Sequence, residues 1–193
     1  MPPKTPLPDP ETIALQALAF GVLAREQPGL APEAQLRMLQ LLADAAGTAG
    51  MAGGQAIDLE SVARELTAEA VENMHGRKTG ALIQGSVLIG AAAAGVISGA
   101  DHDALHRYGA DIGLAFQIQD DILDVEGDPG LLGKTTGADA ARLKPTYPST
   151  VGIDAARHRA HELRDRAIAD LAPLAERGAP LAELAEYIVS RSS

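Results

Sequence analysis

Apolar residues recur along this chain at the spacing of an α-helix. Between residues 10 and 27 they return every three or four positions, and Pro28 then ends the pattern. A glycine-rich passage over residues 47–54 interrupts the next run. The pattern therefore predicts an all-α protein with helices over residues 10–27, 32–47, 67–74, 101–126, 154–172 and 180–190.

Residues 79–100 carry no charge and are long enough to span a bilayer as a helix. Five glycines and polar side chains such as Gln84 and Ser86 make this stretch a poor membrane span. A helix that is apolar all round can equally lie at the centre of a helical protein. We therefore expect a buried core helix rather than a stable membrane insertion.

Composition narrows the class of protein further. Only 3% of the residues are aromatic, which disfavours a β-sandwich or barrel. The formal net charge of -10 makes nucleic acid an unexpected partner, because phosphate recognition needs a basic face. The chain has no cysteine, which excludes disulfides and thiolate metal sites. We expect a cytoplasmic protein with a proline-rich lead-in over residues 1–10 and a single helical domain over residues 11–193.

Three carboxylates gather on the predicted helix that ends near residue 126. Asp120 and Asp124 are one helical turn apart, Asp121 lies beside them, and Gln117 precedes them by one turn. Oxygen ligands without histidine or cysteine suit Mg²⁺, which bridges carboxylates to phosphate groups. The alternative is a solvated acidic face on an acidic protein, but apolar neighbours leave few positions for one.

Basic and polar residues elsewhere form candidate contacts for an anion. Lys78 and Thr79 stand at the start of the uncharged stretch, where a cation and a hydroxyl can hold a phosphate group. They can also simply mark the end of one helix and the start of another. Gln55 follows a glycine pair, and Lys134 and Lys144 follow the acidic helix.

Two histidine pairs have spacings that metal ligands also use. They are His102 with His106 and His158 with His161. No carboxylate pattern accompanies either pair, so we expect surface histidines at all four positions.

In their order along the chain, these motifs resemble those of the trans-isoprenyl diphosphate synthases, and most closely the bacterial farnesyl and geranyl diphosphate synthases. The matching segments read MAGGQAIDLE, MHGRKTGALI, FQIQDDILDVEGDPGLLGK and LKPTYPSTVG, and the final YIVSR is similar to the family's C-terminal end. The resemblance runs from about residue 15 to residue 191. It implies an isoprenoid-synthase-type helical bundle around a central cavity.

The resemblance also implies roles for the candidate residues. Asp120, Asp121 and Asp124 would be the second aspartate-rich motif, which binds Mg²⁺ that grips an allylic diphosphate. Thr79 and Gln117 would line the path of the carbocation. The diphosphate itself would be bound by Lys78, Lys134, Lys144 and Gln55.

The implied activity is that of a prenyltransferase. It would condense isopentenyl diphosphate with dimethylallyl or geranyl diphosphate to make a short-chain trans-isoprenyl diphosphate such as farnesyl diphosphate. The family's proteins carry a first aspartate-rich motif upstream, and this sequence shows none before residue 15. We therefore expect an N-terminally truncated domain, a homodimer by resemblance, and little activity from this chain alone.

Two other functions stay open at this point. One is a non-catalytic or partial helical subunit of a prenyl diphosphate synthase. The other is a terpene cyclase with a single aspartate-rich motif, which is disfavoured because the second metal motif of cyclases is missing from the sequence.

Overall fold

The structure is a computed structural model, and it describes residues 10–126 and 145–191. Within these two ranges every regular element is a helix, which confirms the all-α prediction. The elements, in chain order, are α1 (Pro10–Leu23), α2 (Pro32–Ala46), α3 (Met51–Glu60), α4 (Ala68–His75), the π-helix η1 (Gly76–Gly80), α5 (Ala81–Ala93), α6 (Gly99–Glu126), α9 (Tyr147–Val151), α10 (Ile153–Asp170), the 3-10 helix η2 (Ala172–Gly178) and α11 (Ala179–Ser190).

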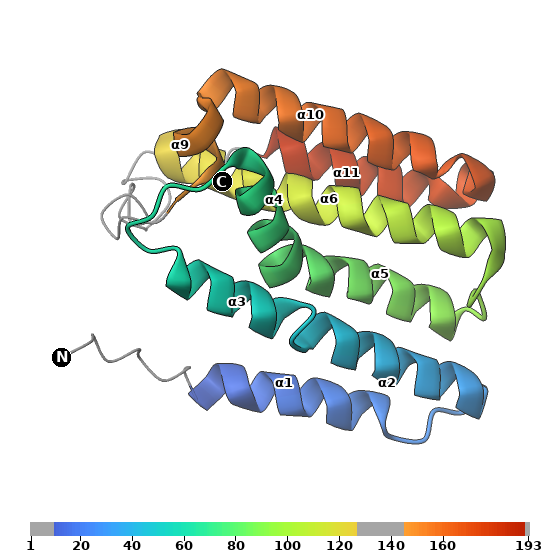
Figure 1. Cartoon of the computed structure of the whole chain (residues 1–193). Helices are drawn as coiled ribbons and strands as arrows, with labels where there is room; N and C mark the ends of the chain where they lie inside the picture. The colour runs from blue at the N-terminus through green and yellow to red at the C-terminus, as the bar shows by residue number, and fades with distance from the viewer. Residues whose placement is uncertain (1–9, 127–144, 192–193) are drawn as a thin grey trace.

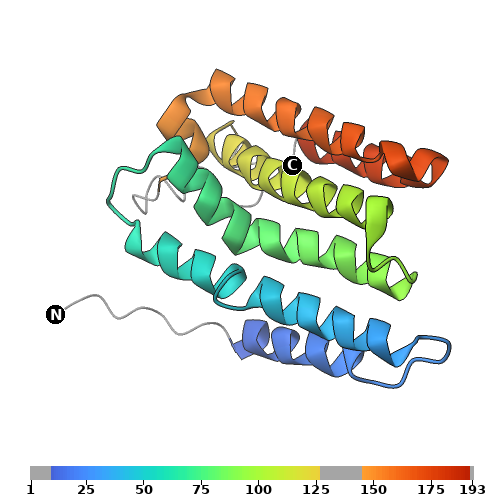
Figure 2. The ribbon, with the colours of Figure 1, turned by 45° about the vertical axis from the view of Figure 1, so that its right-hand side comes forward.

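The long helices stack side by side in a layered bundle. Figure 1 shows α1 at one edge, then the row formed by α2 and α3, then α4 and α5, then α6, with α10 and α11 at the opposite edge; the turned view in Figure 2 keeps this order. The 28-residue helix α6 packs against α5 on one side and against α10 and α11 on the other. It is therefore the central element of the bundle.

Small side chains set the distance between α6 and α10. Ala104 and Ala115 of α6, and Ala156 and Ala160 of α10, have no exposed surface. Larger side chains fill the space beside them, among them Tyr108, whose hydroxyl donates a 2.8 Å hydrogen bond to the carbonyl oxygen of Leu181. These alanines thus permit close helix packing as well as helix formation.

Several predicted boundaries are wrong. The first helix ends at Leu23 rather than at residue 27. The glycine-rich passage over residues 47–54 is not a loop throughout, because α3 begins at Met51. The uncharged stretch does not form one helix: α5 ends at Ala93, Gly95 in the following turn has a φ angle of 81°, and Gly99, the first residue of α6, has one of 85°. In the described part of the chain, no helix has both the length and the apolar character needed to cross a membrane.

Candidate functional site

The three aspartates of α6 do not share one environment. The side chain of Asp120 is 49% exposed and lies 3.4 Å from Nη2 of Arg191, near the C-terminus. Asp124, one turn later, is partly exposed. The side chain of Asp121 is only 6% exposed and faces the interior. The acidic edge of α6, defined here as Asp120 and Asp124, is thus distinct from the buried Asp121.

Asp121 is held by groups from three other parts of the site. Its Oδ2 accepts a 2.8 Å hydrogen bond from the backbone N–H of Tyr147, and its Oδ1 accepts one of 3.3 Å from Nε2 of Gln117. Nε2 of His75 lies 3.6 Å from Oδ2. Asp121 therefore joins α4, α6 and the start of α9.

The π-helix η1 places Lys78 and Thr79 near Asp121. Helices α3 and α6 pack against the backbone of η1 from two sides, at glycines that allow close backbone contact. A Cβ atom on Gly54 of α3 would lie 2.2 Å from the backbone nitrogen of Lys78, and one on Gly113 of α6 would lie 2.8 Å from Cα of Gly80. Positions 54 and 113 therefore admit only glycine without a backbone shift.

The side chains of η1 are engaged with residues of both neighbours. Nζ of Lys78 donates a 2.9 Å hydrogen bond to Oδ2 of the buried Asp58, on α3. The hydroxyl of Thr79 donates a 2.7 Å hydrogen bond to Oε1 of Gln117, on α6. Lys78, Thr79 and Gln117, which the sequence analysis grouped, thus meet Asp121 at one site.

A small cavity of about 30 Å³ lies among these residues. Burial lowers the pKa of His75 to about 4, and the Lys78 ammonium contributes to the same effect. His75 is therefore neutral at physiological pH, and its Nδ1 is buried without a hydrogen-bond partner among the described residues. The cavity is lined by Asp58, Met74, His75, Lys78, Gln117, Asp121, Pro145 and Thr146.

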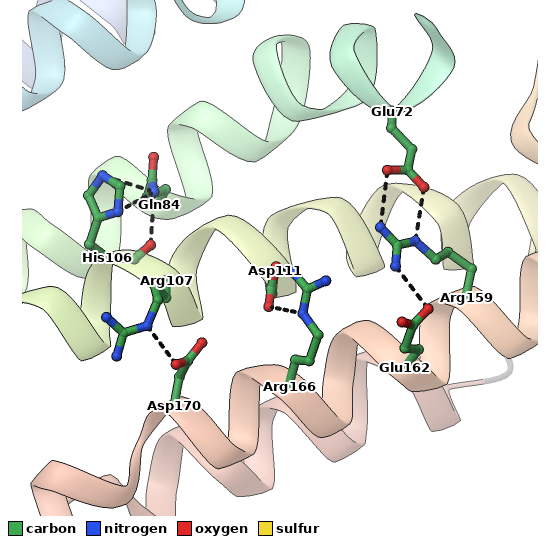
Figure 3. Close-up of polar contacts among 9 residues, drawn as sticks. All are labelled: Glu72, Gln84, His106, Arg107, Asp111, Arg159, Glu162, Arg166 and Asp170. Carbon is green, nitrogen blue, oxygen red and sulfur yellow. Dashed lines mark hydrogen bonds and ion pairs between the residues drawn. The ribbon is translucent and has the colours of Figure 1, made fainter. Parts of the chain in front are cut away.

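Tyr147 is anchored at its side chain as well as at its backbone. Its hydroxyl donates a 2.9 Å hydrogen bond to Oε1 of Glu72, on α4. Glu72 also receives two hydrogen bonds from the guanidinium of Arg159, on α10, at 2.9 and 3.1 Å (Figure 3). Burial raises the pKa of Tyr147 to about 12, and the Glu72 contact adds to the shift. The sequence analysis missed Glu72, Tyr147 and Arg159 because residues so far apart in sequence give no local signal.

The other predicted site residues are not seen to contact this site in the described part of the chain. Gln55 lies on α3, one turn before Asp58, and its partly buried side chain makes no hydrogen bond with the described residues. Lys134 and Lys144 lie outside the described residues. His102 is partly buried and the other three paired histidines are exposed, and the described side chains include no group of three histidine or carboxylate ligands that could hold a metal.

The acidic edge fits Mg²⁺ in the way that this ion usually binds. Mg²⁺ keeps several waters and takes one or two carboxylates together with phosphate oxygens, rather than a complete cage of protein ligands. Asp120 and Asp124 offer two such carboxylates, at least partly open to solvent and one turn apart. A magnesium ion that also contacts a substrate diphosphate is therefore compatible with these residues.

Comparisons with known proteins give consistent results. The family model described as Polyprenyl synthetase matches residues 11–173. The chain is 44% identical over 183 residues to the farnesyl diphosphate synthase of Escherichia coli K12, covering 93% of this chain and 61% of that protein. It is 41% identical to a dimethylallyltranstransferase of Fischerella ambigua, covering 93% of this chain and 52% of the relative. The chain thus spans about three fifths or less of the length of these relatives.

Solved structures resemble the fold over nearly the whole chain. An FPP/GFPP synthase from Zymomonas mobilis superimposes with a TM-score of 0.75 at 39% identity, covering 91% of this chain and 58% of that one. A geranyltransferase from Helicobacter pylori, complexed with magnesium and isoprenyl diphosphate, superimposes with a TM-score of 0.76 at 29% identity. This second match covers 92% of this chain and 57% of the other.

Proposed function

The chain belongs to the polyprenyl synthetase family, and from this premise we propose that it acts in prenyl transfer. The reaction is the condensation of isopentenyl diphosphate with an allylic diphosphate, dimethylallyl or geranyl, to give a short-chain product such as farnesyl diphosphate. One observation carries the proposal: Thr79 of η1 donates a hydrogen bond to Gln117 of α6, one turn before the aspartates, and Lys78 lines the same small cavity as Gln117. The chain thereby combines a cation, polar oxygens and carboxylates at one end of the bundle.

In this proposal the charged groups bind the diphosphate of the allylic substrate. Mg²⁺ held at the acidic edge would neutralise the diphosphate so that it can leave. Lys78 would add a second positive charge, and would give up part of its contact with Asp58 to do so. Lys134, Lys144 and Gln55 are proposed as further diphosphate contacts on the basis of the family resemblance.

In the same proposal, the uncharged polar side chains of Thr79 and Gln117 lie beside the hydrocarbon part of the substrate. The oxygens of Thr79 and Gln117 hold each other in a fixed geometry and would face the allylic cation as it forms. The departing diphosphate can accept the proton that the reaction releases. A protein general base is therefore not needed, which agrees with a site whose buried histidine is neutral.

Calorimetry with inorganic diphosphate tests the charged half of the site. We expect binding that requires Mg²⁺ and that falls by about tenfold or more in Asp120→Asn/Asp124→Asn. Asp103→Asn is the matched control, because Asp103 is an exposed aspartate on the same helix. Equal binding with and without Mg²⁺, in the native protein and the double variant alike, would disprove the assignment.

We also propose that the chain forms a homodimer through α1. This helix packs against α2 and leaves a stripe of apolar side chains in solvent: Leu15 is 65% exposed, Leu18 53% and Val22 46%. A stripe at this spacing is the kind of surface that a second helix covers.

The alternative function is that of a helical subunit which pairs with a complete synthase. A radiolabelled condensation assay separates the two functions when it is run on the purified chain, with the Escherichia coli relative as control. Turnover by the chain alone would favour the enzyme, whereas a chain that is inactive alone but changes the turnover of the added relative would favour the subunit.

A further inference from the structure

Asp121 is set apart from the acidic edge by its contacts, although the three aspartates lie within five residues of the sequence. We propose that Asp121 is a positioning residue, which orients Gln117 and fixes the start of α9, rather than a ligand of the metal. The inference rests on the proposed function and deepens it, because it divides the three aspartates between two tasks.

The surroundings of Asp121 suit hydrogen-bond donors and not a hydrated cation. Its two oxygens each accept a hydrogen bond from an N–H group, at 2.8 and 3.3 Å, and its side chain is 6% exposed. Mg²⁺ gives up its waters reluctantly, so it favours carboxylates that reach solvent. Asp120, with a side chain that is 49% exposed, meets this requirement and Asp121 does not.

The first task of Asp121 is to set the direction of the Gln117 amide. Because the carboxylate only accepts hydrogen bonds, it faces the Nε2 group of Gln117. The amide oxygen is then turned toward Thr79, whose hydroxyl donates to it at 2.7 Å. Asp121 thus acts on the reacting end of the site through Gln117 and Thr79, without touching substrate itself.

The second task of Asp121 is to hold the start of α9. Tyr147 is fixed through its backbone N–H by Asp121 and through its hydroxyl by Glu72. Glu72 is in turn held by Arg159 of α10. Two anchors at opposite ends of one residue leave Tyr147 little freedom, so the start of α9 keeps its place relative to α4 and α6.

Three measurements on the full chain test this division of roles. The first is amide exchange over residues 145–151 without metal. The second is the ¹H–¹⁵N signal pair of the Gln117 side-chain amide, assigned by its loss in Gln117→Glu. The third is Mg²⁺-dependent binding of inorganic diphosphate. The variants are Asp121→Asn, Asp121→Ala and Asp120→Asn, with Asp103→Asn as control.

We expect Asp121→Ala to exchange about tenfold faster over residues 145–151, because a charge-assisted hydrogen bond is lost. In Asp121→Asn the new amide cannot accept from both donors, so the Gln117 signals should move while diphosphate affinity stays within about threefold of native. Asp120→Asn should show the reverse, with unmoved Gln117 signals and weakened magnesium-dependent binding. If Asp121 only held α9 and did not orient Gln117, the Gln117 signals would not move in Asp121→Asn.

Two results would overturn the assignment. One is a loss of magnesium-dependent binding in Asp121→Asn as large as that in Asp120→Asn. The other is an unchanged Gln117 signal pair in Asp121→Asn. If the native chain shows no magnesium-dependent binding at all, the proposed function fails, but the exchange and Gln117 measurements still decide whether Asp121 positions these groups.

Discussion

At the scale of single residues, the site depends on groups whose charge is set by burial. His75 is the clearest case: burial of its ring, aided by the nearby Lys78 ammonium, lowers its pKa from 6.5 to about 4. Protonation of this ring would place a second cation beside Lys78 in a poorly solvated space. The folded protein therefore favours the neutral ring.

This shift predicts how stability changes with pH. The unfolded chain binds a proton at His75 below about pH 6.5, and the folded chain does so only below about pH 4. The contribution of His75 to stability is thus complete at neutral pH and is lost as pH falls through this window, by about 2 kcal/mol between pH 7 and pH 5. Denaturant unfolding of the native chain and His75→Gln measures it, and parallel pH profiles for the two would contradict the prediction.

The pair formed by Lys78 and Asp58 predicts a coupled loss of stability and binding. Lys78→Met removes a cation from the buried Asp58 carboxylate and should lower the free energy of unfolding by about 1–3 kcal/mol, since the lysine itself is partly exposed. The same variant should bind inorganic diphosphate about tenfold more weakly. Arg77→Gln, which removes a neighbouring exposed charge, is the control and should change neither quantity by a comparable amount.

The sequence grouped residues that lie together in space better than it distinguished their surroundings. Lys78, Thr79 and Gln117 lie at one site, as grouped, whereas Asp121 was expected to share the surroundings of Asp120 and is buried instead. A signal for the difference was present: Asp121 lies three residues after Ile118 and next to Ile122, both of which are buried. The other half of its surroundings comes from Tyr147, and no local pattern predicts that contact.

At the scale of elements, the glycines at helix crossings hold η1 in place. Gly54 of α3 and Gly113 of α6 allow the two helices to reach the backbone of the π-turn, on which Lys78 and Thr79 sit. Glycine lowers helix propensity by about 1 kcal/mol relative to alanine, so it is retained within a helix at some cost. Here the gain is close backbone contact at the site.

A substitution series separates propensity from packing. Gly54→Ala and Gly113→Ala should each destabilise the protein by about 2–4 kcal/mol, because the new methyl group meets backbone atoms that cannot move away alone. Gly90→Ala in α5 is the matched control, since nothing lies within 4 Å of its Cβ position. It should stabilise the protein by about 0.5–1 kcal/mol. Thermal unfolding of the three variants decides, and destabilisation by all three would refute the distinction.

These same glycines explain why the sequence misjudged α3. A glycine-rich passage reads as a loop when packing is unknown, but Gly53 and Gly54 are helical and Gly54 serves a helix crossing. By contrast, Gly95 lies just after the end of α5 and Gly99 begins α6, both with the positive φ angles that glycine permits. Propensity alone cannot tell the two uses apart, because the difference lies in what approaches the glycine from elsewhere in the chain.

At the scale of the whole molecule, the bundle has a well-buried centre and an apolar edge. The core gathers around α6, whereas α1 lies at the margin in both views of the ribbon (Figures 1 and 2). The all-α class and the family were predictable, because helical spacing and ordered motifs are properties of the sequence itself. The stacking order of the helices was not, since it depends on contacts between distant segments.

The apolar stripe on α1 predicts a change in assembly. We expect the native chain to sediment as a dimer and Leu15→Glu/Leu18→Glu to sediment as a monomer, because two buried charges at an apolar interface are strongly unfavourable. Leu184→Glu, on α11, replaces another exposed leucine and should leave the dimer intact. Sedimentation velocity provides the measurement, and a native monomer would exclude the proposed interface.

The π-turn of η1 also sets the rotation of α4 relative to α5. A π-turn holds one more residue than an α-turn, so Gly76–Gly80 turns the chain about as far as one residue fewer would in an α-helix. If the same five residues wound as a regular α-helix, α4 would rotate by about 100° relative to α5. Glu72 would then point away from Tyr147 and Arg159 while α5 stayed packed on α2 and α6. The extra residue of the π-turn is therefore what lets one continuous helical segment present Lys78 and Glu72 to different partners.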